Sequence, residues 1–216
     1  MTGPSAIDSS RLTVLLDVRH PLAYLALGPA VRLERELGLD INWLPLVCQP
    51  LKAPAEPRSD DDRGRRHRRF RALAIAREIE THADTQGLVV RDFYRAPDPR
   101  ALNLAWLWIR AHAPSLLEPF LFEAFRAYWA LELDPGDLAA VRSLVEAMGG
   151  DGATCAAWCV STSDGMATAA ALEAELRERG LHAVPTYLVE DEVFLGRQHW
   201  PMIRWILQGR PGHGPI

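Results

Sequence analysis

The chain has 216 residues, of which 48% are hydrophobic and 24% are charged, so it can bury a full core as one large domain or as a domain with an insertion. Its formal net charge of −4 gives no overall attraction to nucleic acid or to an acidic membrane surface. The cysteines, Cys48, Cys155 and Cys159, include no Cys-x-x-Cys pair, which indicates neither a secreted disulfide framework nor a thioredoxin-type redox couple.

We expect no targeting signal at the start of the chain. Residues 1–10 are small and polar without a basic region, and no later stretch approaches the roughly 20 uninterrupted apolar residues that a membrane-spanning helix needs. We therefore expect a cytoplasmic protein without a membrane partner. Residues 1–10 and 211–216 are expected to be flexible termini.

The first half-domain is predicted by a strand, a helix and a second strand in succession. An aliphatic run over residues 12–17 predicts a strand, after which the chain turns through His20-Pro21 into a helical pattern. That pattern continues over residues 26–37 and stops at Gly38, a residue well suited to a helix C-cap. Residues 39–47 predict a second strand, so we expect a right-handed βαβ unit with parallel strands.

A polar loop and a long helix come next. Residues 50–64 combine prolines with an acidic run and predict a mobile surface loop. Residues 65–86 are rich in Arg, Ala, Leu and Ile and predict one helix, which Gly87 closes. The arginines between Arg58 and Arg71 are interpreted as a solvated helix face, with an anion-binding patch as the alternative.

The remainder of the chain alternates helical patterns with Pro and Gly. These patterns cover residues 99–113, 114–131, 135–149 and 153–180 and predict a helical insertion. Strand character returns over residues 187–195, with a hairpin signal at its centre, and residues 201–208 predict a terminal helix. Cys155 and Cys159 fall on one helix face and are interpreted as small core residues. The pattern as a whole predicts an α/β fold with a mixed sheet.

Two segments at the ends of the chain carry a family resemblance. The first reads Asp17-Val-Arg-His-Pro-Leu-Ala-Tyr-Leu25 and the second begins Ala183-Val-Pro-Thr-Tyr, with further matches at residues 125–129 and 133–138 and in the run through residue 203. They resemble the family that groups 2-hydroxychromene-2-carboxylate isomerases, kappa-class glutathione transferases and bacterial disulfide oxidoreductases. In the isomerase and transferase branches the first motif is Asp-x-x-Ser-Pro-Tyr-Ser/Ala-Tyr/Trp-Leu, so His20 replaces the Ser.

The resemblance implies a thioredoxin-like, DsbA-like domain with a helical insertion domain. Residues 11–52 and 181–210 would form the discontinuous thioredoxin-like domain, and residues 65–180 the insertion. It also implies glutathione as cofactor, a small aromatic or apolar electrophile as substrate, isomerase or transferase activity, and a homodimer. Phe120, Phe122 and Trp129 are interpreted either as the dimer surface or as core.

The expected catalytic residue is His20. A residue just before Pro21, at a helix N-terminus, lies among unpaired N–H groups and near the positive end of the helix dipole, which disfavours an imidazolium. A neutral imidazole could donate a hydrogen bond to a bound thiolate, act as general base without glutathione, or be inert. The sequence leaves all three roles open.

The expected binding residues come from the family motifs. The resemblance implies a cis bond between Val184 and Pro185, with the Val184 backbone pairing a peptide-like ligand. Lys52 is expected near the glutathione carboxylate, and Gln198 replaces the family's Asp, which weakens the contact to the γ-glutamyl amino group. Arg19 and His199 complete the expected binding residues.

The sequence also bears on other binding and function classes. We expect no metal, because no His lies at zinc-ligand spacing from the cysteines. Tryptophans on helical patterns, without a basic groove beside them, argue against a nucleic-acid partner. The alternatives to a glutathione-linked enzyme are a glutathione-independent enzyme that uses His20 as acid or base and a non-catalytic protein of the same fold that binds a ligand or partner.

Overall fold

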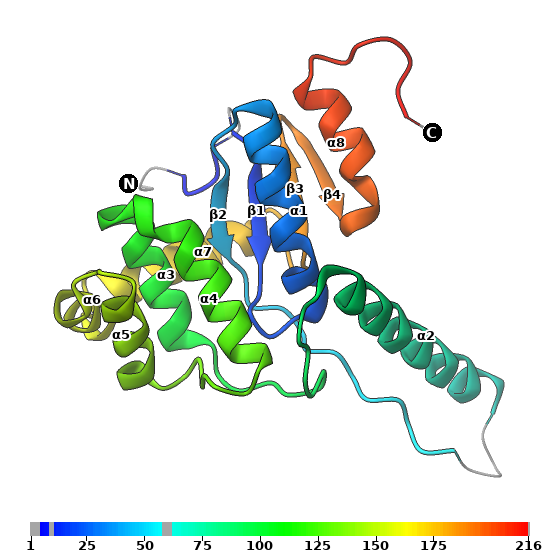
Figure 1. Cartoon of the computed structure of the whole chain (residues 1–216), viewed down its shortest axis with the longest axis horizontal. Helices are drawn as coiled ribbons and strands as arrows, with labels where there is room; N and C mark the ends of the chain where they lie inside the picture. The colour runs from blue at the N-terminus through cyan, green and yellow to red at the C-terminus, as the bar shows by residue number, and fades with distance from the viewer. Residues whose placement is uncertain (1–4, 9–10, 58–61, 216) are drawn as a thin grey trace.

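The computed structural model describes residues 5–8, 11–57 and 62–215. Within them, four strands form one mixed sheet in the order β2-β1-β3-β4, with helices around it (Figure 1). The strands are β1 (Thr13–Leu16), β2 (Asn42–Pro45), β3 (Thr186–Val189) and β4 (Glu192–Leu195). β1 pairs with β2 in parallel, whereas β3 runs antiparallel to both β1 and β4. The predicted mixed sheet and parallel βαβ unit are confirmed.

The helix α1 (Pro21–Leu37) connects the two parallel strands. Pro21 occupies its first position, where the missing N–H costs no helical hydrogen bond. At the other end Gly38 has a φ of 63° and donates its N–H to the Glu34 carbonyl, which is the left-handed cap expected from the sequence. The helix begins directly after His20, and its N-terminus therefore lies at the end of the sheet where β1 stops.

The segment between β2 and β3 is helical. Its helices are α2 (Arg63–Gln86), α3 (Arg100–His112), α4 (Leu117–Trp129), α5 (Leu138–Ala147), α6 (Gly152–Val160) and α7 (Gly165–Glu178). A single 3₁₀ turn (Pro114–Leu116) precedes α4. Helices α3 to α7 gather on the β2 side of the sheet, whereas α2 projects away from them and contacts α1 (Figure 1).

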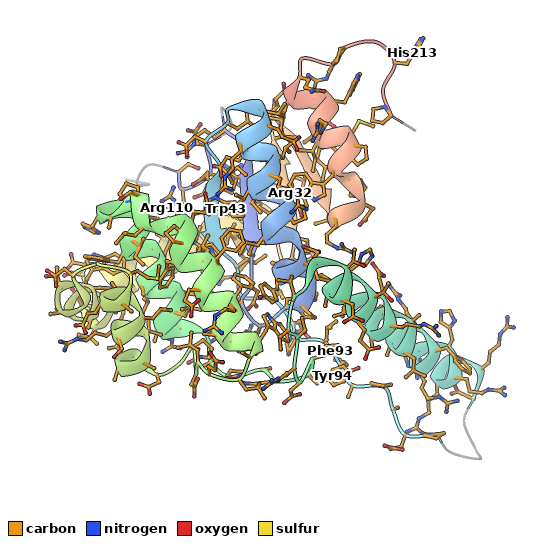
Figure 2. All side chains as sticks on the ribbon, in the orientation of Figure 1. Arg32, Trp43, Phe93, Tyr94, Arg110 and His213 are labelled. Carbon is orange, nitrogen blue, oxygen red and sulfur yellow. The ribbon has the colours of Figure 1, made fainter. Side chains whose placement is uncertain are left out.

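The helix α3 fastens this helical group to the sheet. The indole Nε1 of Trp106 donates to the Trp43 carbonyl of β2 at 3.3 Å, and Arg110 donates to the Asn42 side-chain oxygen at 2.9 Å. Trp43 and Arg110 are labelled in Figure 2. These bonds satisfy buried polar groups, so α3 is held in a fixed position relative to β2.

One predicted helix is divided in two. Residues 153–180 form α6 and α7, with a break at residues 161–164 where the side chains of Ser161 and Asp164 hydrogen-bond at 2.6 Å. The next residue, Gly165, lies so close to α6 that a Cβ would stand 2.4 Å from the Trp158 carbonyl oxygen. Helical continuation was therefore wrong here, because a polar turn and a glycine close approach intervene.

Many of the aromatic side chains lie in the core. Trp106, Phe120 and Trp129 are buried, which leaves only Phe122 of the expected dimer residues with substantial exposure. Phe120 and Trp129 are therefore core, and the alternative that they form a dimer surface is wrong for this pair. Cys155 and Cys159 are also buried, as predicted for small core residues.

The chain ends in a hairpin followed by a helix. After β4, a 3₁₀ turn (Arg197–His199) leads into α8 (Trp200–Leu207), which contacts β3.

The polar loop predicted over residues 50–64 lies partly outside the described residues, as do Arg58 and most of the acidic run. None of the helices in the described part of the chain is both long and apolar enough to cross a membrane.

Candidate functional site

The candidate site lies at the end of the sheet where β1 and β2 stop and β3 starts. Leu15 of β1 pairs with Thr186 of β3, so the residues just after β1 lie beside Pro185. Leu16 pairs with Pro45, which brings the chain that follows β2 to the same edge. Because parallel strands deliver their carboxyl ends to one edge, this geometry assembles residues from three distant parts of the sequence.

The Asp17 side chain joins the segments that meet at this edge of the sheet. Its buried carboxylate accepts hydrogen bonds from the Cys48 backbone N–H at 2.9 Å and from the Arg19 backbone N–H at 3.0 Å. It also forms a two-point ion pair with the Arg19 guanidinium, at 3.0 and 2.8 Å. Such a charge-assisted fork is among the stronger polar interactions in proteins, so the loop after β1 and the chain after β2 are locked together.

Arg19 adds further hydrogen bonds between these segments, and its donors face the protein itself. Its Nη2 donates to the Cys48 carbonyl at 3.1 Å and its Nη1 to the Pro97 carbonyl at 3.4 Å. With Asp17 these contacts use four of its five N–H groups inside the protein. Arg19, expected as a binding contact, is therefore a supporting residue, because its donors are spent on the chain itself.

His20 lies at the N-cap of α1 with extended backbone dihedrals and makes no side-chain cap hydrogen bond. Within the described residues its Nδ1 atom is buried and has no hydrogen-bond partner. Burial lowers the pKa of His20 below its usual value, although the Asp17 carboxylate opposes this shift. The imidazole is therefore neutral at physiological pH and keeps an unused polar atom.

The turn before β3 offers an unpaired backbone edge. The peptide bond between Val184 and Pro185 is cis. In the described part of the chain no backbone hydrogen bond involves the N–H or carbonyl of Val184, whereas the Pro185 carbonyl accepts from Gly196. A free donor and acceptor on one residue can pair with an extended peptide.

Two predicted binding residues follow β4. Gln198 lies in the 3₁₀ turn before α8, where its Nε2 donates to the Leu195 carbonyl at 2.9 Å and lies 3.2 Å from the His199 Nε2. The His199 ring packs against Phe194. Both side chains are thus held by their own hairpin, and neither caps α8 through its side chain.

The structure places Lys52 against α2. It is exposed on a smaller cavity of about 200 Å³, between the chain after β2 and one face of α2, together with Arg68, Arg71 and Phe93. Phe93 and its neighbour Tyr94 are labelled beside α2 in Figure 2. Lys52 therefore shares a cationic rim with α2, a placement the sequence did not predict.

A larger cavity of about 520 Å³ opens between the end of β2, α3 and α7. Its apolar walls include Leu104 and Leu107 of α3 and Leu172 and Leu176 of α7. Its margins include Val47, Asp98 and His182, which are close in sequence to Cys48, Pro97 and Val184. Arg19 holds the segments around Cys48 and Pro97 in place through its hydrogen bonds to their carbonyls. The sequence did not identify this cavity, because its walls come from three separate stretches.

The protein's own thiols are poorly suited to chemistry. Burial raises the pKa of Cys48, with the neighbouring Asp17 carboxylate adding to the shift. The hydrogen bond with Cys159 and then burial raise the pKa of Cys155. That same hydrogen bond lowers the pKa of Cys159, but Cys159 is buried. The described residues therefore present no exposed, activated thiol. No group of three metal-ligating side chains occurs in the described residues.

These features define the class of protein. A mixed sheet whose cis-proline turn adjoins the N-terminus of the first helix, interrupted by a helical insertion, is a thioredoxin-type fold. The chain belongs to the DSBA-like thioredoxin domain family, whose sequence pattern matches residues 17–208. A search of curated proteins finds no match.

Solved structures share this fold at low sequence identity. A 2-hydroxychromene-2-carboxylate isomerase superposes with a TM-score of 0.69 at 18% identity, covering 92% of this chain and 94% of its own. A probable DsbA oxidoreductase from Streptomyces coelicolor gives 0.65 at 17% identity, covering 95% and 93%. The cytosolic disulfide reductase DsbM from Pseudomonas aeruginosa, solved with GSH, gives 0.58 at 18% identity, covering 93% and 98%. The fold predicted from the two end motifs is confirmed.

Proposed function

We propose that this protein is a glutathione-linked isomerase or transferase that acts on a small apolar or aromatic electrophile. One observation carries the proposal: a neutral imidazole with a buried, unpartnered Nδ1 lies at the N-terminus of α1. The structural neighbours include one protein named as an isomerase and one solved with GSH, which supports the proposal at the level of fold.

The argument for an external thiol starts from the chain's own cysteines. The pKa of Cys48 is raised. The hydrogen bond with Cys155 lowers the pKa of Cys159, but all three cysteines are buried, so none is exposed to act as a nucleophile on a bound substrate. The helix N-terminus nevertheless favours an anion through its unpaired N–H groups and dipole. Glutathione would supply the missing thiol nucleophile at this point.

Each residue of the site then has a defined task. His20 donates a hydrogen bond to the sulfur and favours its deprotonated form. Val184 pairs its free N–H and carbonyl with the peptide backbone of the tripeptide, and Lys52 lends positive charge to its carboxylates. Asp17 and Arg19 hold the loop in place, while the cavity beside α3 and α7 takes the apolar substrate.

Two weak contacts to glutathione determine the affinity that we expect for this ligand. The Gln198 Nε2 is engaged with Leu195 and His199, and an amide carries no charge for an ammonium group. Lys52 is exposed to solvent, where an ion pair contributes little. We therefore expect glutathione to bind in the micromolar to low-millimolar range.

Calorimetric titration tests the proposal with two ligands and two variants. Wild type should bind glutathione more tightly than S-methylglutathione, which cannot ionise at sulfur. His20→Ala should weaken glutathione binding about tenfold, the size of one hydrogen bond to a charged group, and leave S-methylglutathione unchanged. His213→Ala is the matched control, since His213 is exposed on the C-terminal tail (Figure 2).

Three outcomes separate the alternatives. Equal binding of the two ligands by wild type, or absence of binding, would exclude the sulfur contact. Turnover of an aromatic electrophile without glutathione, abolished by His20→Ala, would indicate an enzyme that uses His20 as acid or base. Ligand binding without turnover under any condition would indicate a binding protein.

A further inference from the structure

We infer that the cavity between α3 and α7 binds a neutral apolar molecule carrying a single hydrogen-bond donor, such as a phenol, and that Asn103 selects for that donor. The inference rests on the proposed function only in calling this molecule the substrate.

Asn103 combines a place on the cavity wall with an unsatisfied polar atom. It is the fourth residue of α3 and lines the cavity beside Leu104 and Leu107. Its Oδ1 atom is buried and has no hydrogen-bond partner within the described residues. A buried amide oxygen without a donor costs free energy on the order of 1–3 kcal/mol, so a ligand that brings a donor recovers this loss.

The residue type at position 103 also supports a role in ligand binding. Asn is among the weaker residues in a helix interior, and Leu or Ala at this position would both stabilise the helix and extend the apolar wall. Asn103 also takes no part in holding α3 to β2, because Trp106 and Arg110 make those bonds. The polar side chain therefore has no evident structural task.

Charge on the cavity rim argues for a neutral ligand. Arg177 pairs with Glu173 at 2.7 Å, and Arg100 lies 3.9 Å from the Asp98 carboxylate. Each rim cation thus has an acidic neighbour, and an anionic ligand would have to compete with that neighbour. The volume of about 520 Å³ falls in the range of small-molecule sites, which take an apolar body fixed by a few polar contacts.

Direct binding of matched probes tests this inference without glutathione. The probes are 2-naphthol, naphthalene and naphthalene-2-carboxylate, followed by fluorescence or calorimetry on the full chain. Wild type should bind 2-naphthol about five- to tenfold more tightly than naphthalene and bind the carboxylate most weakly. Asn103→Leu should remove the preference for 2-naphthol, whereas Asn103→Asp, which keeps an acceptor oxygen, should retain it.

A second pair of variants locates the probes. Ala169→Phe fills the cavity from α7 and should abolish binding, whereas Ala167→Phe adds the same ring to an exposed position of the same helix and should not. Equal affinity for 2-naphthol and naphthalene, a preference that survives Asn103→Leu, or tightest binding of the carboxylate would each overturn the inference. Failure of glutathione to bind would leave these results standing, so the two proposals fail separately.

Discussion

Asp17 and Arg19 form the interaction on which the site's geometry depends. Each is more than nine-tenths buried, and together they join the loop after β1 to the chain after β2 and to the segment before α3. A buried ion pair is costly to break because the remaining partner is left charged and unpaired. The motif marked Asp17, whereas Arg19 falls on one of its unspecified positions, and only the structure revealed that the Arg19 donors face the protein itself.

Asp17→Asn tests this support. It should lower the free energy of unfolding by about 3 to 5 kcal/mol, since the Arg19 guanidinium loses its buried counter-charge. Urea unfolding followed by circular dichroism measures the change. Glu146→Gln, which breaks the exposed pair with Arg142, is the control and should cost less than about 1 kcal/mol. Equal effects of the two substitutions would contradict the role given to Asp17.

His20 should make stability fall on the acid side of neutrality. Burial lowers the pKa of His20 in the folded state, so below about pH 6.5 the unfolded chain takes up a proton that the folded chain resists. The free energy of unfolding should therefore drop as the pH falls from about 7.5 to 5. In His20→Gln this drop should be smaller, and in His213→Gln it should match wild type. Parallel pH profiles for all three proteins would contradict the buried, neutral state of His20.

At the scale of elements, α2 is anchored by one end. Ile79 and Ala83 are its buried residues and pack with Leu25 of α1, and the Gln86 side chain donates to the Leu25 carbonyl. Nearer its N-terminus, Phe70 and Leu73 are 60% and 46% exposed. The sequence predicted this helix from its composition and from Gly87, but not which face is buried, because its apolar residues do not form one stripe.

Two substitutions on α2 separate its anchored and free parts. Ile79→Ala should cost about 2 to 5 kcal/mol, the range for emptying a buried position. Leu73→Ala should change stability by less than about 0.5 kcal/mol, as expected for the surface. Chemical denaturation of both variants measures the difference, and a large loss for Leu73→Ala would show that its side chain is buried against something in solution.

Helix boundaries were predictable where a cap residue marks them. Gly38 and Gly87 end α1 and α2 with φ values of 63° and 65°, and both were expected from the sequence. The division between α6 and α7 was missed although Ser161-Thr-Ser-Asp-Gly165 is a strong turn signal. There the helical periodicity on both sides outweighed the local turn chemistry.

At the scale of the whole molecule, the fold followed from the sequence and much of the site did not. The motifs at Asp17 and Val184 identify a strand end and a turn that the fold must bring together. Asn103 and His182 belong to no motif, and the family motif that marked Lys52 did not place it against α2. The places of all three depend on how the helical insertion lies against the sheet. The cavities arise from that arrangement, which no local pattern encodes.

The central claim is that His20 at the start of α1 stabilises a thiolate. Its most direct test is the ultraviolet absorbance of the glutathione thiolate, titrated against pH in the presence of excess wild-type protein and of excess His20→Ala. We predict that the bound thiol ionises at lower pH than free glutathione on wild type and that His20→Ala reverses most of the shift. A bound thiol that titrates like free glutathione, or a shift that His20→Ala leaves intact, would contradict the account.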